Sequence, residues 1–202
     1  MKQTKQTARC KFHPALVAVT LMLIAFAIPM RAQTTQTMDI VTFYGFPDNS
    51  PPGTTISFPQ IHDQAGGTGT FDDPVTFATD PRLFSPGQVI YVPFLQKYFI
   101  MEDLCTNSGP GDQGNGCVND FDAGLAHIDL WTGGTADSDV NAQLQCEDSL
   151  TSNNVDIIVD PDDQQPVDTT PLFNADTGEC FQPSSATIFH FQFSFVYPKA
   201  WA

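Results

Sequence analysis

The segment Ala126-His-Ile-Asp-Leu-Trp131 combines a strand-like apolar pattern with an acid at its centre. Side chains alternate between the two faces of a β-strand, so His127, Asp129 and Trp131 share one face. The two apolar residues between them take the opposite face, which we expect to be buried. A carboxylate half-buried in a sheet costs free energy unless it is paired or protonated, so Asp129 is a candidate functional acid.

Two more aspartates lie at the edges of apolar runs upstream of this segment. Asp80 ends the run Phe77-Ala-Thr-Asp80, and Asp103 lies in Tyr98-Phe-Ile-Met-Glu-Asp-Leu104. Three acids set in this way within one part of the chain point to a shared site. Polysaccharide chemistry uses paired carboxyl groups, so it is a candidate activity.

The rest of the chain also has a β pattern. It is rich in Phe, Thr, Val and Ile and in the turn residues Gly, Pro, Asn and Asp, which favours an all-β domain. We expect extended segments at residues 40–44, 55–58, 74–79, 89–92, 97–102, 126–131, 155–159 and 187–197. The segment 140–150 fits either a short helix or a strand. The Gly/Asp/Asn-rich stretch 106–124 is long enough to predict a functional or disordered loop.

The N-terminus has the order of a secretory signal peptide. Residues 1–11 carry four basic residues and no acid, and the apolar run from Ala15 to Met30 ends at Arg31-Ala-Gln33. We place the cleavage after Ala32, which makes residues 1–32 the signal peptide and 33–39 a loose polar leader. The alternative is an uncleaved anchor, although the run is short of the ~20 residues that span a bilayer. The expected location is secreted or periplasmic.

Export leaves a strongly acidic chain. All 23 acidic residues but only three of the eight basic residues follow position 32, so residues 33–202 carry a formal net charge of −20. Phosphate neutralisation requires Lys and Arg, so we expect neither nucleic acid nor an anionic membrane surface as a partner. Neutral sugars, cations and basic partners remain compatible. We expect one monomeric domain with its own core.

Four cysteines follow the signal peptide, and an even number in an exported chain favours two disulfides. Among the three possible connectivities we favour Cys105–Cys117, across a Gly/Asn/Ser-rich loop, and Cys146–Cys180. A zinc site is the alternative, but the spacings are irregular and no histidine lies in a ligand pattern beside them. The acidic stretch 156–168 lacks EF-hand spacing, so we interpret it as a solvated loop rather than a Ca²⁺ site. We therefore expect no metal and no cofactor.

Four short motifs occur in an order that resembles a known bacterial domain. They are Ala78-Thr-Asp-Pro81, Pro86-Gly-Gln-Val-Ile-Tyr-Val92, Glu102-Asp103 and Ile128-Asp-Leu130. This order resembles the three-aspartate domain of membrane-bound lytic transglycosylase A and related wall proteins. The last motif, with His127 before it, is also similar to the His-Phe-Asp-Leu strand of family-45 endoglucanases and expansins.

These families share a six-stranded double-psi β-barrel, so the resemblance implies an all-β fold of this type. It implies a barrel over residues 40–150, which leaves residues 151–202 as a C-terminal β extension packed on the barrel. It also implies roles for the acids. Asp129 matches the endoglucanase acid that protonates the leaving oxygen, Asp103 matches the Glu-Asp step at the wall-enzyme cleft, and Asp80 is expected to be structural.

This chain departs from both patterns. The transglycosylases follow their Asp with Gly-Gly-Ala-Ile-Lys-Gly, where this chain has Leu104-Cys-Thr106. The endoglucanases carry a second Asp at the end of strand one, where this chain has Gly45 and Phe46. Asp48, in the loop that follows, is the candidate to reach that place. A catalytic site in this chain therefore requires an acid that comes from outside the end of strand one.

Sugar contacts are expected from Trp131 and Tyr44 as stacking platforms, and from Asp48 and His127. The alternatives are core packing for the aromatic rings, an Asx-turn for Asp48 and a structural group for His127. The leading hypothesis is a secreted protein that cleaves glycosidic bonds in cell-wall polysaccharide by carboxyl acid catalysis. The alternatives are a non-catalytic expansin-like module that binds or loosens walls, and a structural or inhibitor-like module whose acids only stabilise loops.

Overall fold

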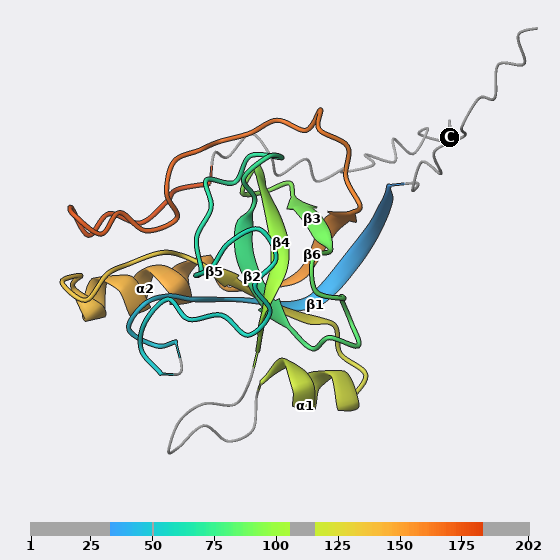
Figure 1. The fold of residues 1–202 in the computed structure, drawn as a ribbon, viewed down its shortest axis with the longest axis horizontal. Coiled ribbons are helices and arrows are strands. Elements are labelled where there is room, and N and C mark those ends of the chain that lie inside the picture. The colour runs from blue at the N-terminus through green and yellow to red at the C-terminus, as the bar shows by residue number, and fades with distance from the viewer. Residues whose placement is uncertain (1–32, 50, 106–115, 184–202) are drawn as a thin grey trace, which may run out of the picture. The chain divides into compact units, whose positions relative to one another are not determined.

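The computed structural model describes residues 33–49, 51–105 and 116–183 (Figure 1). Six strands form a closed barrel in the order β1-β5-β2-β4-β3-β6. The elements are β1 (Thr34–Tyr44), β2 (Val75–Thr79), β3 (Val89–Val92), β4 (Lys97–Leu104), α1 (Cys117–Asp122), β5 (His127–Trp131), α2 (Val140–Leu150) and β6 (Ser152–Val159). The all-β fold expected from composition, and the six-stranded barrel that the resemblance implies, are confirmed.

The barrel is mixed in strand direction. β1 pairs with β5, and β2 with β4, in parallel, whereas the other four pairings are antiparallel. The core side of this sheet follows the alternation of the sequence: Val41 pairs with Ile128, and Phe77 with Leu130, and all four are fully buried. The residues next to them along each strand point to the other face, which carries the acids.

Two boundaries differ from those expected. β1 begins at Thr34, so residues 34–39 form part of a strand that pairs with β6 rather than a loose leader. Most of these residues are polar and partly exposed, so the apolar alternation that predicts strands is missing there. β6 pairs with β1 and β3 and closes the barrel, so the barrel extends past residue 150. The expected signal peptide (1–32) and the strand 187–197 lie outside the described residues.

Two segments with ambiguous or weak patterns are now assigned. Residues 140–150 form helix α2, whose N-cap Asp139 accepts hydrogen bonds from the backbone of Asn141 and Ala142. The extended segment expected at 55–58 is a loop with bends. In the described part of the chain, neither helix has the length and apolar character needed to span a bilayer.

Both favoured disulfides are confirmed. Cys105–Cys117 connects the end of β4 to the start of α1, and Cys146–Cys180 connects α2 to the chain beyond β6. Since the sulfurs are bonded to each other, the zinc alternative is excluded for these cysteines. His127 lies within 4.8 Å of the Cys105–Cys117 sulfurs, but these two sulfurs offer no thiolate ligand.

Candidate functional site

Thr42, Asp129, Ala78 and Asp103 form one row across the four neighbouring strands β1, β5, β2 and β4. The strand register pairs Thr42 with Asp129, Asp129 with Ala78, and Ala78 with Asp103. Neighbouring strands lie about 4.8 Å apart, so the backbones that carry Asp129 and Asp103 are separated by about 10 Å. The small side chain between them is a methyl group, which leaves space between the two carboxyl groups.

A β-bulge creates this alignment. Phe77 pairs with Met101, but the next residue, Ala78, pairs with Asp103, so Glu102 is the extra residue of β4. A bulge changes which side chain faces a given side of the sheet. Without it, Glu102 rather than Asp103 would stand in the row beside Asp129. The sequence gives no signal for this shift.

Asp129 is half-buried, and one of its oxygens accepts a hydrogen bond from the Thr42 hydroxyl at 2.8 Å. Burial raises the pKa of Asp129 to about 7, with smaller contributions from the negative charges of Asp48 and Asp103, while the Thr42 hydrogen bond acts in the opposite direction. A carboxyl group with such a pKa is protonated in about half of the molecules at neutral pH. This is the property required of a general acid.

His127 is connected to Asp129 through the same hydroxyl. His127 Nε2 lies 2.8 Å from Thr42 Oγ1, and its Nδ1 lies 2.6 Å from Asp120 Oδ2. A hydroxyl has one proton, so Thr42 can donate to Asp129 or to His127, but not fully to both. When Asp129 is ionised, Thr42 donates to it and accepts from a protonated Nε2. When Asp129 carries a proton, it donates to Thr42, which donates to His127.

Both ring nitrogens of His127 therefore take part in this chain of hydrogen bonds. The residue is only 5 % exposed. Burial lowers its pKa, and the hydrogen bond to Asp120 opposes that effect. The His127 imidazole is almost fully covered in this structure, and the substrate-binding role expected for it stays a prediction. Its position on the strand face of Asp129 is as expected.

Asp103 lies under Tyr44 and the loop before β2. Its carboxyl accepts from the Tyr44 hydroxyl at 3.2 Å, from the Ser57 backbone at 2.9 Å and hydroxyl at 2.8 Å, and from the Leu104 backbone at 2.8 Å. The residue is 4 % exposed. Four donors and deep burial hold Asp103 in place, so it is less suited than Asp129 to deliver a proton to a substrate.

Tyr44 is the point on which the acids converge. Burial raises its pKa well above the usual value, and the charges of Asp103, Asp129 and Asp48 each raise it further. Its ring packs edge-on against Trp131, with 5.2 Å between ring centroids. Tyr44 and Trp131 are both nearly buried, at 7 % and 4 % exposed. Both rings pack against the core in this structure, and Trp131 also lines a pocket of about 270 Å³, so sugar contacts from these two residues stay a prediction.

Asp48 folds back to the end of β1, where its Oδ1 accepts a hydrogen bond from the Gly45 backbone at 2.7 Å. There it meets the carboxyl group of Glu147 of α2, with which it interacts. Asp48 is exposed as a residue, whereas Glu147 is buried. The carboxyl end of Asp48 is nonetheless partly removed from water, which raises its pKa, and burial raises the pKa of Glu147 to about 8.

Glu147 was missed by the sequence analysis. Within α2 the buried residues are Gln143, Cys146, Glu147 and Leu150, a spacing of i, i+3, i+4 and i+7. That spacing is typical of the buried face of a helix. The signal was thus present, but it could be used only once residues 140–150 were assigned as a helix.

Asp80 stands outside the row. Its carboxylate is bound by the Arg82 guanidinium, with Oδ2 at 2.6 Å from Nη2, and this hydrogen bond holds the pKa of Asp80 below its usual value. Arg82 also binds Asp122 at 2.8 Å and lies over the Phe121 ring. These contacts attach the end of β2 to α1, which is a structural task.

Glu102 anchors the long loop between β1 and β2. One carboxyl oxygen accepts from the backbone of Gln60, Ile61 and His62, and the other lies 2.7 Å from His62 Nδ1. His62 Nε2 in turn lies 3.0 Å from Asp73 Oδ1. The loop that covers Asp103 is thereby fixed to the barrel through a fully buried acid.

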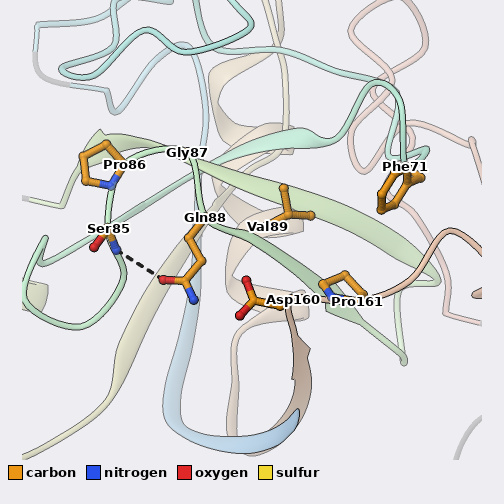
Figure 2. Close-up of a pocket in the computed structure, with 8 residues that line it drawn as sticks. All are labelled: Phe71, Ser85, Pro86, Gly87, Gln88, Val89, Asp160 and Pro161. Atoms are coloured by element: carbon orange, nitrogen blue, oxygen red, sulfur yellow. Dashed lines mark hydrogen bonds between the residues drawn. The ribbon is translucent and has the colours of Figure 1, made fainter. Parts of the chain in front are cut away.

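A pocket of about 510 Å³ has none of these carboxyl groups in its lining (Figure 2). It is lined by Phe71, Ser85, Pro86, Gly87, Gln88, Val89, Asp160 and Pro161. Asp160 follows β6, and the Gly87 N–H donates to the Met101 carbonyl of β4 at 2.8 Å. The pocket therefore lies beside β4 and the end of β6 and is lined by other side chains than the acid cluster.

The fold and the cluster together define a class: a disulfide-bonded β-barrel protein with several interacting carboxyl groups on one face of its sheet. Residues 35–181 match the model of the family described as the DDB_G0273701 N-terminal domain, and the chain belongs to this family. A Dictyostelium discoideum relative, the uncharacterized protein DDB_G0273701/DDB_G0273221, is 38% identical over 143 residues. That match covers 70% of this chain and 59% of the relative. No solved structure matches the chain.

Proposed function

We propose that this protein is a secreted double-psi β-barrel protein that cleaves glycosidic bonds in cell-wall polysaccharide. The observation that carries the proposal is the placement of Asp129: a half-buried carboxyl group held by the Thr42 hydroxyl in the same row as Asp103, where burial raises its pKa to about 7. Glycosidic cleavage needs an acid that retains its proton near neutral pH and a second carboxyl group nearby.

In the reaction, Asp129 donates its proton to the glycosidic oxygen as the bond from that oxygen to the sugar carbon breaks. Positive charge develops on the sugar ring, and the acids around Tyr44 stabilise it. In hydrolysis, water attacks the sugar carbon and gives its proton to Asp48. In a transglycosylase-type reaction the sugar's own 6-hydroxyl attacks instead and gives its proton to the Asp129 carboxylate, which restores the acid. After hydrolysis, Thr42 and His127 supply a hydrogen-bonded route by which Asp129 regains a proton.

Two further observations support the wider proposal. A closed six-stranded barrel with two parallel pairings is compatible with the double-psi architecture of the families that the sequence resembles. Two disulfides favour an oxidising compartment outside the cytosol. A secreted or periplasmic monomer that meets a neutral glycan fits the acidic charge of the chain.

One observation favours the second candidate, a non-catalytic expansin-like module. The end of β1 has Gly45 where the endoglucanases carry an acid, so the base for water must come from the following loop. A protein that binds glycan without cleaving it needs no such base. This alternative keeps the same polysaccharide partner and the same face of the barrel.

The test is incubation of residues 33–202 with cellulose and with peptidoglycan, followed by mass spectrometry of the soluble products. The proposal expects released sugars or anhydro-sugars from the wild-type protein and a loss of at least ~100-fold for Asp129→Asn. Asp72→Asn, at an exposed loop position, is the matched control and should retain full activity. Retained pull-down on the polymer without any soluble product would favour the expansin-like module, and absence of both would contradict both candidates.

A further inference from the structure

Gly45 ends β1 at a place where no side chain fits. A Cβ atom there would lie 1.8 Å from Gln143 Nε2, 2.6 Å from Thr132 Oγ1 and 2.7 Å from Glu147 Oε1. Real Cβ atoms essentially never come this close to other atoms. The position at which the endoglucanases carry their strand-one acid is therefore occupied by side chains that come from other elements, and one of these is itself an acid.

The acid at this position is Glu147, which lies on α2. Gln143 and Glu147 are four residues apart, so both project from the same face of the helix, and both are buried. Gln143 Nε2 donates to the Gly133 carbonyl at 2.9 Å and to Thr132 Oγ1 at 3.2 Å. The Thr132 hydroxyl also lies 2.9 Å from Glu147 Oε1. The disulfide at Cys146, next to Glu147, connects the helix to Cys180.

The second carboxyl group at this position is that of Asp48. Asp48 Oδ1 lies 2.7 Å from the Gly45 nitrogen, and Glu147 Oε1 lies 2.7 Å from the place of a Cβ on the same residue, so both carboxyl groups lie at Gly45. Two carboxyl groups held this close avoid repulsion only if one of them carries a proton. Glu147 is the group that keeps the proton, because it is 3 % exposed and its charge would be the more costly to bury. Asp48 is exposed, and its carboxylate accepts a hydrogen bond from the Gly45 backbone N–H, so Asp48 carries the negative charge of the pair.

Within the described residues, the charge of the pair is not compensated by an ion pair. In the described part of the chain, no ion pair with a basic residue involves either Asp48 or Glu147. The charged or titratable groups that act on the pair are Asp129 and Tyr44, through their interactions with Asp48. The hydrogen-bonding groups around Glu147 are Thr132 and Gln143, which are neutral.

We propose that Asp48 and Glu147 form a dyad that shares one proton, and that this dyad replaces the strand-one acid of the endoglucanases. Glu147 is the positioning residue: it acts through Asp48 and orients the carboxylate that accepts a proton from the attacking water. The catalytic consequence rests on the proposed function, whereas the shared proton does not require any enzymatic activity.

The shared proton can be measured directly in the full mature chain, residues 33–202. Side-chain carboxyl ¹³C signals are followed by NMR as the pH is raised, with assignment from Glu147→Gln and Asp48→Asn. We expect a Glu147 signal with a midpoint near 8, consistent with the raised pKa of Glu147. In Asp48→Asn this midpoint should fall, because the neighbouring negative charge is gone. A Glu147 midpoint near the model-peptide value of ~4.3, or one that Asp48→Asn leaves unchanged, would overturn the dyad.

A metal ion bridging the two carboxyl groups is the competing explanation for their proximity. Addition of CaCl₂ or MgCl₂ to the same sample decides between them. The dyad predicts that millimolar concentrations of either salt leave the Glu147 midpoint in place. A salt-dependent release of the proton, with ionisation of both carboxyl groups, would overturn the shared proton in favour of a cation site.

Activity measurements test the positioning role separately. Glu147→Gln can still donate a hydrogen bond to Asp48, so its kcat should stay near that of the wild type while the dyad's contribution to the pH profile disappears. Glu147→Ala should lower kcat ~10-fold or more. Equal losses in both variants would overturn the positioning role. If no glycan is cleaved by the wild-type protein, the proposed function fails, and the NMR titration still decides the dyad.

Discussion

Thr42 and Asp129 face each other across the parallel strands β1 and β5, and the Thr42 hydroxyl lies 2.8 Å from the Asp129 carboxyl. The same hydroxyl lies 2.8 Å from His127 Nε2. One small side chain therefore connects the proposed acid to a buried histidine. The electrostatic environment of Asp129 depends on this contact as well as on burial.

Replacement of Thr42 by Val tests this relationship with almost no change in shape. The Thr42 hydrogen bond lowers the pKa of Asp129, so its removal should raise that pKa above the wild-type value of about 7. The ¹³C titration of Asp129 measures the change, and a hydrolytic activity should show its basic limb moved to higher pH. Thr35→Val, at an exposed position on the same strand, is the control. An unchanged Asp129 midpoint would contradict the assigned hydrogen bond.

The stability of the protein should depend on the protonation of Asp129. Its pKa is raised from 3.8 to about 7 in the folded state. The contribution of protonated Asp129 to the stability of the fold is fully present below pH 3.8 and is lost as the pH rises to about 7. Asp129→Asn cannot ionise, so it should lose less stability between pH 5 and pH 8 than the wild type, by about 1–3 kcal/mol. Urea unfolding at the two pH values measures this difference, and parallel losses in the two proteins would speak against a buried, neutral Asp129.

The sequence was sufficient to predict the barrel strands and the strand face of Asp129. The apolar alternation around Ile128 and Leu130 is strong, and the spacing of two residues fixes which side chains share a face. The disulfide pairs followed from compartment and loop composition. These predictions rest on local patterns, which a single sequence contains.

The rest of the site depends on contacts that local patterns do not encode. The bulge that brings Asp103 rather than Glu102 beside Asp129 is a property of strand pairing. Asp48 reaches β1 because its loop folds back onto Gly45, and Glu147 reaches Asp48 only because α2 packs near the end of β1. The burial of Trp131 depends likewise on the elements that cover it, which a single sequence does not show.

The His62–Glu102 contact predicts a second pH dependence of stability, at higher pH. Burial lowers the pKa of His62, but hydrogen bonds to Asp73 and Glu102 outweigh it and raise the pKa above 6.5. The protonated form is therefore favoured in the folded protein. Its contribution is fully present below pH 6.5 and is lost as the pH rises through the folded-state pKa. The pKa of Glu102 is lowered in the folded protein, so its contribution to stability is present above pH 4.5, its usual pKa.

We expect His62→Asn to remove the part of this dependence that lies above pH 6.5. Thermal unfolding at pH 6 and pH 9 should show that the wild type loses more stability than the variant over this interval. Asp63→Asn, the exposed neighbour, should behave as the wild type. If His62→Asn shows the same pH dependence of stability as the wild type, His62 is not held in its charged form in the folded protein.

The two disulfides should stabilise the protein to different extents. Cys146–Cys180 closes a loop of 34 residues and Cys105–Cys117 one of 12. Chain entropy alone predicts about 3.8 and 2.8 kcal/mol for these loops. Urea unfolding of the paired variants Cys146→Ala/Cys180→Ala and Cys105→Ala/Cys117→Ala measures both values. Loss of the first disulfide should also loosen α2 and so lower the pKa of Glu147, whereas loss of the second should leave that pKa in place. A Glu147 titration that responds equally to both variants would show that the disulfide beside it does not hold the dyad.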